Sequence, residues 1–380
     1  MKVLYLTVGN GNHDRRFLVK LAERGYETCL VYFHPDGRQY EGLKGIQPFY
    51  IGNGKAPKGA WAKGVDYLRM YRALSRLIMK LKPDVVHGGW VLNAGFLGAL
   101  TGFKPYILMP WGSDILEHPD ESRIWRAMAR YSIRRSSLIT VDAETVKKKI
   151  LELVPSYPAE RITVFPWGID LGVFHPDPAG RAEVRRALGW KDRKILIMTR
   201  YFQPVYGIDV FLKALPEVKK SHPGIGVLLA GSGPLKGELE ALVQRLGLSD
   251  VVRFLGETRP QELARYLQAA DLYVTTSYTD GTSVSLIEAL ASALPVVTTD
   301  VPSLLEWVKE GENGRVVPCG DVNGVGQAVR WHLEHPEDSR QMGGRNLGLA
   351  RERADWDHNF SLLEGMYREA LQMHAGGGQL

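Results

Sequence analysis

Short apolar runs alternate with helical patterns along the first half of the chain. Residues 2–8 are mostly apolar and lead into a glycine-rich turn at residues 9–11, which predicts a buried strand and then a turn. Between residues 61 and 81, apolar side chains recur every three or four positions, as on one face of a helix. Further strands are predicted at residues 27–33, 84–87, 106–109 and 138–141. This alternation is typical of a parallel, doubly wound sheet.

The same alternation restarts after Pro178. Strands are predicted at residues 195–198, 226–230, 251–255, 272–276 and 295–299, with helical patterns between them. The Pro and Gly content of the connecting segment, residues 165–176, suits a hinge region. We therefore expect an α/β protein with two Rossmann-like domains, over residues 1–170 and 177–355. Because open parallel sheets bind ligands beyond the carboxyl ends of their strands, we expect the two domains to face a central cleft.

The composition narrows the class of protein. The 380 residues are 44% apolar and 24% charged, which excludes a disordered chain, a collagen and a disulfide scaffold. The longest uncharged stretch, residues 88–103, is too short to span a membrane, and the N-terminal residues lack the pattern of a signal peptide. Cys29 and Cys319 match no metal or redox spacing. We expect a cytoplasmic protein.

Positive charge is concentrated in the first half of the sequence. Residues 1–176 hold 25 Lys and Arg against 16 Asp and Glu, whereas residues 177–380 hold 23 against 26. Many of the basic residues lie on predicted helices, among them Arg123, Arg126, Arg130, Arg134 and Arg135. They form either a solvated helix face or a patch that meets an anionic membrane surface. A nucleic-acid partner is not expected, because no recognition motif accompanies the charge.

Two glycine-rich turns join a predicted strand to a predicted helix. The first, Gly9-Asn10-Gly11, lets the backbone approach an anionic ligand at a helix N-terminus, although it lacks the third glycine of the dinucleotide-binding fingerprint. The second contains Gly231 and Gly233 and occupies the equivalent place in the second half. Each is either a plain tight turn or a turn that binds a ligand.

The segment 278–290 is the most informative. A predicted strand ends before Asp280, and small hydroxyl residues then lead into an apolar helix that contains Glu288. Free N–H groups at that helix start favour a diphosphate. The two carboxylates are suited to accept hydrogen bonds from the hydroxyls of a sugar and a ribose. The alternative is a helix N-cap followed by a solvated glutamate.

Arg200 follows the predicted strand 195–198 and is a candidate for the same site. An arginine at the carboxyl end of a strand can bind two phosphate oxygens with one guanidinium group. The alternative is an ordinary surface arginine.

Together these motifs resemble those of the retaining glycosyltransferases of family four, which have the GT-B fold. The stretch from Asp280 to Glu288 is similar to the family's E-x7-E element, with Asp in place of the first Glu. Four shorter segments are similar to other family motifs: Gly231-Ser232-Gly233-Pro234 to the GxGP turn, Phe254-Leu255-Gly256 to the strand end that contacts the base, Gly311-Glu312-Asn313-Gly314 to the GxNG turn, and Trp356-Asp357 to the start of the final helix. In the family that helix, here residues 356–375, crosses back to the first domain.

The resemblance implies a nucleotide-sugar donor in the second domain and an acceptor in the first. Glu288 would hold the ribose, Asp280 the donor sugar, and Arg200 the departing diphosphate. The other donor-binding residues would be Gly231, Gly233, Gly256, Gly281, Thr282, Ser283, Val284, Ser285 and Tyr206. On the acceptor side the resemblance implies Gly9, Asn10, Gly11 and Trp111, with Asp114 as a further catalytic residue. No metal or other cofactor is expected, because arginine and helix dipoles supply the positive charge.

Three positions depart from the family pattern. Tyr206 stands where the family usually carries a lysine, so one cationic contact to the diphosphate is lost. Trp111 stands where the family often has a histidine, and a tryptophan can stack on a sugar face but cannot accept a proton. Asp280 is one methylene shorter than glutamate.

The sequence therefore predicts a retaining hexosyltransferase that moves a sugar from a nucleotide sugar to a glycan or lipid-linked acceptor, in polysaccharide or glycolipid synthesis. The implied mechanism is front-face, with the leaving phosphate helping to take the acceptor proton. The protein would act in the cytoplasm, and peripheral binding at the inner face of the membrane is an open question. Two alternatives also stay open: a non-catalytic nucleotide-sugar-binding subunit of a glycan assembly complex, and a nucleotide-sugar epimerase.

Overall fold

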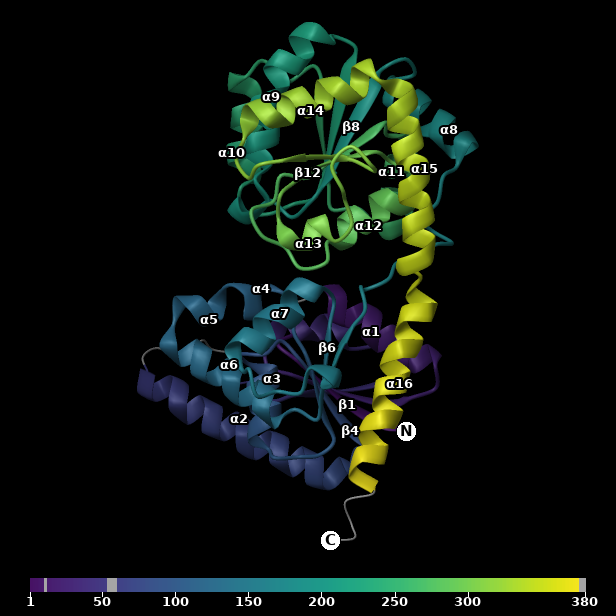
Figure 1. The fold of residues 1–380 in the computed structure, drawn as a ribbon. Helices are drawn as coiled ribbons and strands as arrows, with labels where there is room; N and C mark the ends of the chain where they lie inside the picture. The colour runs from purple at the N-terminus through teal and green to yellow at the C-terminus, as the bar shows by residue number, and fades with distance from the viewer. Residues whose placement is uncertain (10–11, 53–59, 376–380) are drawn as a thin grey trace. The chain divides into compact units, whose positions relative to one another are not determined.

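The strands of the computed structural model form two parallel sheets, and each sheet belongs to its own unit of the chain (Figure 1). Unit 1 comprises Met1–Phe165 and Phe360–Leu380, and unit 2 comprises Pro166–Asn359. The structure describes residues 1–9, 12–52 and 60–375. The predicted fold class, an α/β protein with two Rossmann-like parallel-sheet domains, is confirmed.

Unit 1 contains a seven-stranded parallel sheet in the order β3-β2-β1-β4-β5-β6-β7. Its strands are β1 (Lys2–Thr7), β2 (Glu27–Tyr32), β3 (Ile46–Tyr50), β4 (Val85–Gly89), β5 (Tyr106–Met109), β6 (Leu138–Val141) and β7 (Ile162–Val164). The helices between them are α1 (Asn12–Glu23), η1 (Pro35–Tyr40), α2 (Ala60–Leu81), α3 (Ala94–Leu100), α4 (Ser113–Leu116), α5 (His118–Glu121), α6 (Arg123–Arg135), α7 (Glu144–Leu153) and η2 (Ala159–Arg161).

Unit 2 contains a six-stranded parallel sheet in the order β10-β9-β8-β11-β12-β13. Its strands are β8 (Lys194–Thr199), β9 (Ile225–Ala230), β10 (Val252–Gly256), β11 (Leu272–Val274), β12 (Val296–Thr299) and β13 (Arg315–Val317). Its helices are α8 (Pro178–Leu188), η3 (Pro204–Tyr206), α9 (Ile208–Ser221), α10 (Lys236–Arg245), α11 (Pro260–Ala269), α12 (Val284–Ala291), α13 (Pro302–Leu305), α14 (Val322–Glu334) and α15 (Pro336–Arg353).

The central strands are buried on both faces, as expected for parallel sheets covered by crossover helices. Every residue of β5, β6, β9 and β12 is buried. Helices contribute apolar faces to these cores, and α9 alone buries seven residues. Each sheet is therefore a rigid base for the loops at the carboxyl ends of its strands.

The last helix, α16 (Trp356–Ala375), returns the chain from unit 2 to unit 1 (Figure 1). The buried Tyr367 attaches it to unit 1, where its hydroxyl lies 2.6 Å from Nδ1 of His87 in β4. Among the described residues, no helix combines the length and the apolar content that crossing a bilayer requires.

The strands differ from the predicted ones mainly at the sheet edges, and the helices α14 and α15 were not predicted either. The three strands that were not predicted, β3, β7 and β13, are all outermost strands of five or three residues. Edge strands are half exposed, so their apolar runs are weaker than those of central strands. β11 ends at Val274, two residues earlier than predicted, and Thr276 instead donates its hydroxyl to the Gly207 carbonyl at 2.7 Å.

Candidate active site

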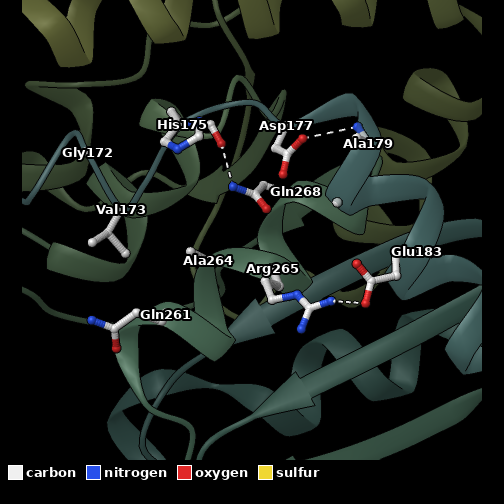
Figure 2. Close-up of a pocket in the computed structure, with 11 residues that line it drawn as sticks. Gly172, Val173, His175, Asp177, Ala179, Glu183, Gln261, Ala264, Arg265 and Gln268 are labelled. Atoms are coloured by element: carbon white, nitrogen blue, oxygen red, sulfur yellow. Dashed lines mark hydrogen bonds and ion pairs between the residues drawn. The ribbon is translucent and has the colours of Figure 1, made fainter.

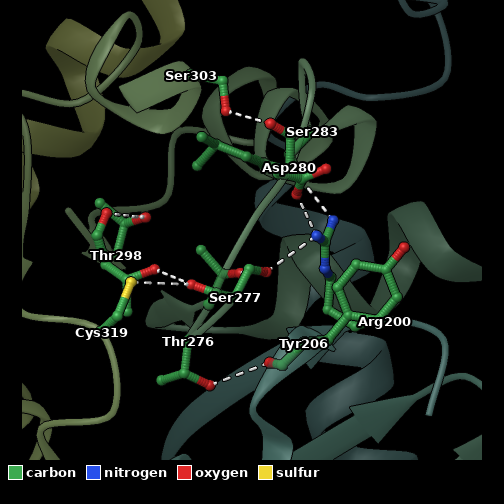
Figure 3. Close-up of polar contacts among 12 residues, drawn as sticks. Arg200, Tyr206, Thr276, Ser277, Asp280, Ser283, Thr298, Ser303 and Cys319 are labelled. Atoms are coloured by element: carbon green, nitrogen blue, oxygen red, sulfur yellow. Dashed lines mark hydrogen bonds and ion pairs between the residues drawn. The ribbon is translucent and has the colours of Figure 1, made fainter. Parts of the chain in front are cut away.

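Four of the predicted residues of unit 2 lie close together beyond the carboxyl ends of its strands: Arg200, Tyr206, Asp280 and Ser283 (Figure 3). Arg200 directly follows β8, Gly231 directly follows β9, and Gly256 ends β10. The loop after β11 contains Ser277 and Asp280 and leads into α12. Because the strands are parallel, all of these carboxyl ends lie along one edge, where open α/β sheets bind their ligands.

Arg200 is the centre of this cluster. The residue is buried, with 8% of its surface exposed. Its guanidinium forms an ion pair with Asp280, donates from Nη1 to Ser283 Oγ at 2.7 Å and donates from Nη2 to Ser277 Oγ at 3.0 Å. A buried charge is stable only when it is paired and hydrogen-bonded. Arg200 is therefore not an ordinary surface arginine.

Asp280 faces Arg200 from the loop before α12. Burial raises the pKa of Asp280, and the adjacent guanidinium opposes that rise. The backbone carbonyl of Asp280 accepts a hydrogen bond from Ser303 Oγ at 2.7 Å, which ties the loop to α13. The sequence predicted that this carboxylate would accept hydrogen bonds from a sugar, and in the structure it binds Arg200.

The helix start that was predicted to receive a diphosphate is the first turn of α12. Ser283 is its N-cap and accepts a hydrogen bond from Leu286 N at 3.3 Å. The first N–H groups of a helix, here including those of Val284 and Ser285, have no carbonyl partner within the helix. Glu288 lies about one turn further on and is partly exposed. The loop before α12 and its first turns hold all the predicted residues of this segment: Gly281, Thr282, Ser283, Val284, Ser285 and Glu288.

Two glycines after β9 let their loop pack directly on the segment that carries Arg200. Gly231 and Gly233 have φ angles of +145° and +154°, which L side chains rarely adopt. A Cβ on Gly231 would collide with the Arg200 carbonyl oxygen, and a Cβ on Gly233 would collide with the backbone of Phe202. The Gly231 N–H donates to the Gly256 carbonyl at 2.8 Å, which joins the ends of β9 and β10. The glycine turn thus helps to set the position of Arg200.

Tyr206 covers the guanidinium group of Arg200. The arginine Cζ lies 4.1 Å from the centre of the tyrosine ring, and Figure 3 shows the two groups stacked. The carbonyls of Tyr206 and Gly207 accept hydrogen bonds from Thr276 Oγ1 at 3.3 and 2.7 Å, which fixes this loop to the end of β11. The residue that departs from the family pattern therefore helps to hold the arginine in place.

Around Arg200 the structure buries several polar side-chain atoms that no sequence pattern indicated. Within the described part of the chain, Arg200 Nε is buried without a hydrogen-bond partner, and the buried Tyr273 Oη and Thr199 Oγ1 interact with each other without normal hydrogen-bond geometry. Burial raises the pKa of Tyr273 to about 12, and the charges of Arg200 and Glu288 act on it in opposite directions. In the sequence Tyr273 looks like an ordinary core aromatic of β11. Buried polar atoms without partners are destabilising and are common at functional sites.

The predicted acceptor residues of unit 1 lie at the carboxyl ends of β1 and β5. Gly9 follows β1 and is buried, whereas Asn10 and Gly11 lie outside the described residues. Trp111 follows β5 and is partly buried, and its indole packs edge-on against Phe17 with the ring centroids 6.1 Å apart.

Asp114, in α4, is fully buried. Its carboxylate accepts hydrogen bonds from Val91 N at 2.7 Å and from Trp111 N at 2.8 Å. Burial raises the pKa of Asp114 to about 6, and these backbone donors oppose the rise. We expected a catalytic residue here. In the structure this carboxylate joins the loops after β4 and β5 through its two backbone hydrogen bonds, and its catalytic role stays a prediction.

A separate open pocket of about 600 Å³ lies beside α8 and α11 of unit 2 (Figure 2). Polar side chains that line it already have partners: Arg265 pairs with Glu183 at 2.6 Å, and Gln268 donates to the backbone carbonyl of His175 at 2.9 Å. No predicted site residue that the structure describes lines this pocket. We assign no function to it.

Two family models match this chain. The model described as glycosyl transferases group 1 matches residues 180–346, and a model described as glycosyl transferase 4-like matches residues 2–143. Together the two matches span most of the chain. The chain belongs to the group 1 glycosyltransferases. The resemblance inferred from the sequence motifs is thereby confirmed.

Relatives of known name match part of the chain. A D-inositol 3-phosphate glycosyltransferase of Streptomyces avermitilis is 33% identical over 235 residues, which are 59% of this chain and 50% of the relative. A GDP-mannose-dependent alpha-(1-6)-phosphatidylinositol monomannoside mannosyltransferase of Mycolicibacterium smegmatis is 29% identical over 201 residues, 50% of this chain and 53% of the relative. The chain thus spans about half the length of these curated relatives.

A solved structure shares the fold over nearly the whole length. Anabaena Alr3699/HepE in complex with UDP and glucose is 20% identical, with a TM-score of 0.79 over 96% of this chain and 99% of that one. At this identity the likeness shows the fold of this group 1 glycosyltransferase, and its ligands belong to the Anabaena protein.

The stacking of Tyr206 on Arg200 gives a stability prediction. We expect Tyr206→Ala to lower the free energy of unfolding by about 1 kcal/mol, because the guanidinium loses its aromatic cover. Tyr206→Phe keeps the ring and serves as the matched control. Chemical denaturation followed by circular dichroism measures both variants, and equal stability of the two would contradict the stacking argument.

For the hydroxyl of Tyr273 we predict no loss of stability, in contrast to Tyr206→Ala. Because the contact of the buried Tyr273 Oη with Thr199 Oγ1 lacks normal hydrogen-bond geometry, Tyr273→Phe should leave the free energy of unfolding unchanged or raise it by about 1 kcal/mol. Tyr367→Phe removes a buried hydroxyl that has a partner at 2.6 Å and should lower it by a similar amount. Thermal unfolding of both variants checks this. If both variants lost the same free energy of unfolding, Tyr273 Oη would have a hydrogen-bond partner in solution.

Proposed function

We propose that this chain is a retaining glycosyltransferase that moves a sugar from a nucleotide-sugar donor to a glycan or lipid-linked acceptor. The observation that carries the proposal is the buried Arg200 beside the first turn of α12. An arginine and a helix N-terminus at one point make an anion site suited to a diphosphate. Family membership and the UDP and glucose bound to the Anabaena protein support a nucleotide sugar as the donor.

Five of the predicted residues of unit 2 would act directly on this donor. Arg200 and the N–H groups of Val284 and Ser285 would bind the diphosphate and stabilise the negative charge that develops as the sugar–phosphate bond breaks. Glu288 would accept hydrogen bonds from the ribose hydroxyls. Asp280 would have two successive roles: it pairs with Arg200 before the donor binds, and it accepts from a sugar hydroxyl once the diphosphate occupies the guanidinium.

Retention follows from the family resemblance and is part of the proposal. In a front-face mechanism the bond from the anomeric carbon to the phosphate oxygen breaks, and the acceptor oxygen bonds to the same face of that carbon. The departing phosphate oxygen takes the acceptor proton. We propose that no metal takes part, because Arg200 and the α12 amides supply positive charge. Within the described residues, no group of three or more His, Cys, Asp or Glu side chains is placed to hold a metal ion.

The acceptor would bind in unit 1, at the loops after β1 and β5. Trp111 offers a ring face there, and Asp114 fixes its backbone. The relatives named for inositol phosphate and for a phosphatidylinositol mannoside support an acceptor with a sugar or cyclitol group. Such an acceptor suits polysaccharide or glycolipid synthesis.

Peripheral binding at the inner membrane face would bring the enzyme to a lipid-linked acceptor. α6 exposes arginines on successive turns, at positions 123, 126, 130 and 134. Arg126 is paired with Asp120 at 2.6 Å, whereas the described residues provide no ion pair for the other three. Unpaired exposed arginines on one helix face attract anionic lipid headgroups.

A second candidate function is a nucleotide-sugar-binding subunit without catalysis of its own. Tyr206 favours it, because the lysine usual in the family is absent, and the remaining cation, Arg200, is already paired with Asp280. Nucleotide binding without turnover, and activity only beside a partner chain, would support this alternative.

The proposed donor roles predict a split between rate and affinity. Arg200→Lys keeps the charge but loses the bidentate hydrogen bond to the diphosphate. We therefore expect the transfer rate to fall about 10²-fold, with a smaller change in nucleotide affinity. Glu288→Gln should instead weaken nucleotide binding about tenfold. A panel of nucleotide sugars with lipid-linked acceptors measures transfer, and calorimetry measures binding. If both variants lost rate and affinity in the same proportion, the assigned roles would be wrong.

The proposed membrane contact predicts charge-dependent binding. Replacing Arg123, Arg130 and Arg134 together by Gln should reduce sedimentation with vesicles that contain anionic lipid at least several-fold, because each basic residue near the surface contributes about 1 kcal/mol. A matched triple variant on α15, with Arg340, Arg345 and Arg351 replaced by Gln, removes equal charge elsewhere and should bind as the parent does. If the parent and both triple variants sedimented equally, the arginines of α6 would form a solvated helix face and not a membrane contact.

A further inference from the structure

Three aromatic rings form a row at the carboxyl edge of the unit 1 sheet. Trp90 directly follows β4, His118 begins α5, and Trp125 lies in the first turn of α6. The ring centroids of Trp90 and His118 are 5.8 Å apart, and those of His118 and Trp125 are 5.1 Å apart. Trp125 is 38% exposed, and the His118 side chain is 28% exposed. The row is therefore accessible, unlike the aromatic side chains of the core.

The backbone at Trp90 is strained. Its φ angle is +68°, in the left-handed region that bulky L residues rarely adopt. Hydrogen bonds hold it there: Trp90 N donates to the Met109 carbonyl at 3.1 Å, and Gly95 N donates to the Trp90 carbonyl at 2.8 Å. Glycine would adopt this conformation without strain. A strained tryptophan at the end of a strand points to a function for its ring.

The strained loop is coupled to Trp111 through Asp114. One carboxylate oxygen accepts from the N–H of Val91, next to Trp90, and the other accepts from the N–H of Trp111. The indole nitrogen of Trp111 also lies so close to Gly89 that a Cβ there would be 2.8 Å from it. The aromatic row and Trp111 therefore lie on neighbouring loops that are held in fixed positions.

Hydrogen-bonding groups accompany the rings. Glu121 Oε1 lies 3.2 Å from His118 Nδ1, and Asp120 pairs with Arg126 and Lys149 at 2.6 Å each. Aromatic faces pack on the C–H faces of a sugar or cyclitol ring, while carboxylates and an imidazole hydrogen-bond to its hydroxyls.

We propose that Trp90, His118 and Trp125 form a subsite that stacks a sugar or cyclitol ring of the acceptor. The inference rests on the proposed function, because it supplies the acceptor chemistry that the donor site in unit 2 leaves open. Asp114 is the positioning residue of this subsite, and its two backbone hydrogen bonds set the loops that carry Trp90 and Trp111.

Saturation-transfer NMR on the full chain tests the stacking directly, with myo-inositol and methyl α-D-mannopyranoside as probes. We expect saturation to reach the C–H protons of at least one probe. Trp125→Leu keeps the apolar bulk without the aromatic face and should abolish the effect, whereas Trp125→Phe should keep most of it. Ile124→Ala, at a neighbouring residue that is 70% exposed, is the control and should match the parent.

Acceptor kinetics and vesicle binding separate the possible outcomes. Trp125→Leu should raise the acceptor KM about tenfold with kcat and nucleotide binding unchanged. Undiminished probe binding and KM in this variant would overturn the subsite, and a loss of vesicle sedimentation alone would show a membrane anchor instead. Probe binding that needs Trp125 in a protein without transferase activity would support the subsite and reject the proposed function. Sugar transfer with an acceptor KM that does not change in Trp125→Leu would support the proposed function and reject the subsite.

Discussion

A guanidinium group buried at the end of a strand needs an anion beside it, and Asp280 supplies that anion to Arg200. Much of the candidate site follows from this constraint. Ser277 and Ser283 each accept one further guanidinium hydrogen, and the ring of Tyr206 covers the face of the group. Removing either charge alone would leave the other buried and unpaired, which is strongly destabilising.

Under the proposed function, the same pair would determine how this site receives a diphosphate. An arriving phosphate would compete with Asp280 for one guanidinium, so part of its binding energy would be spent on separating the pair. The family's usual lysine would add a second cation, and Tyr206 adds none. Affinity for the diphosphate then depends more on the uncharged N–H groups at the start of α12, which attract anions through the helix dipole. If the α12 N–H groups bind much of the diphosphate, a donor site does not need a second cation at position 206.

The sequence predicted the central sheets well because buried parallel strands are continuous apolar runs. It missed β3, β7 and β13, whose partly exposed positions weaken that signal. It also located the α12 segment and Arg200, since motifs local in sequence carry them. It did not predict that Asp280 binds Arg200, because the two residues are 80 positions apart and only the sheet brings them together.

Unit 1 shows the limits of prediction from sequence more clearly. The aromatic row combines residues from three separate elements, and neither the φ angle of Trp90 nor the burial of Asp114 leaves a signal in the sequence. Asp114 looked catalytic because it belongs to a family motif. In the structure its carboxylate joins two loops, a contact that the motif did not indicate, and its catalytic role stays a prediction.

The most direct test of this account is a crystal structure of the protein with a nucleoside diphosphate bound. We predict that the diphosphate lies against Arg200 and the first turn of α12, with Glu288 at the ribose and Asp280 released from the guanidinium. A nucleotide bound elsewhere, or an Arg200–Asp280 pair still intact beside an occupied site, would contradict it.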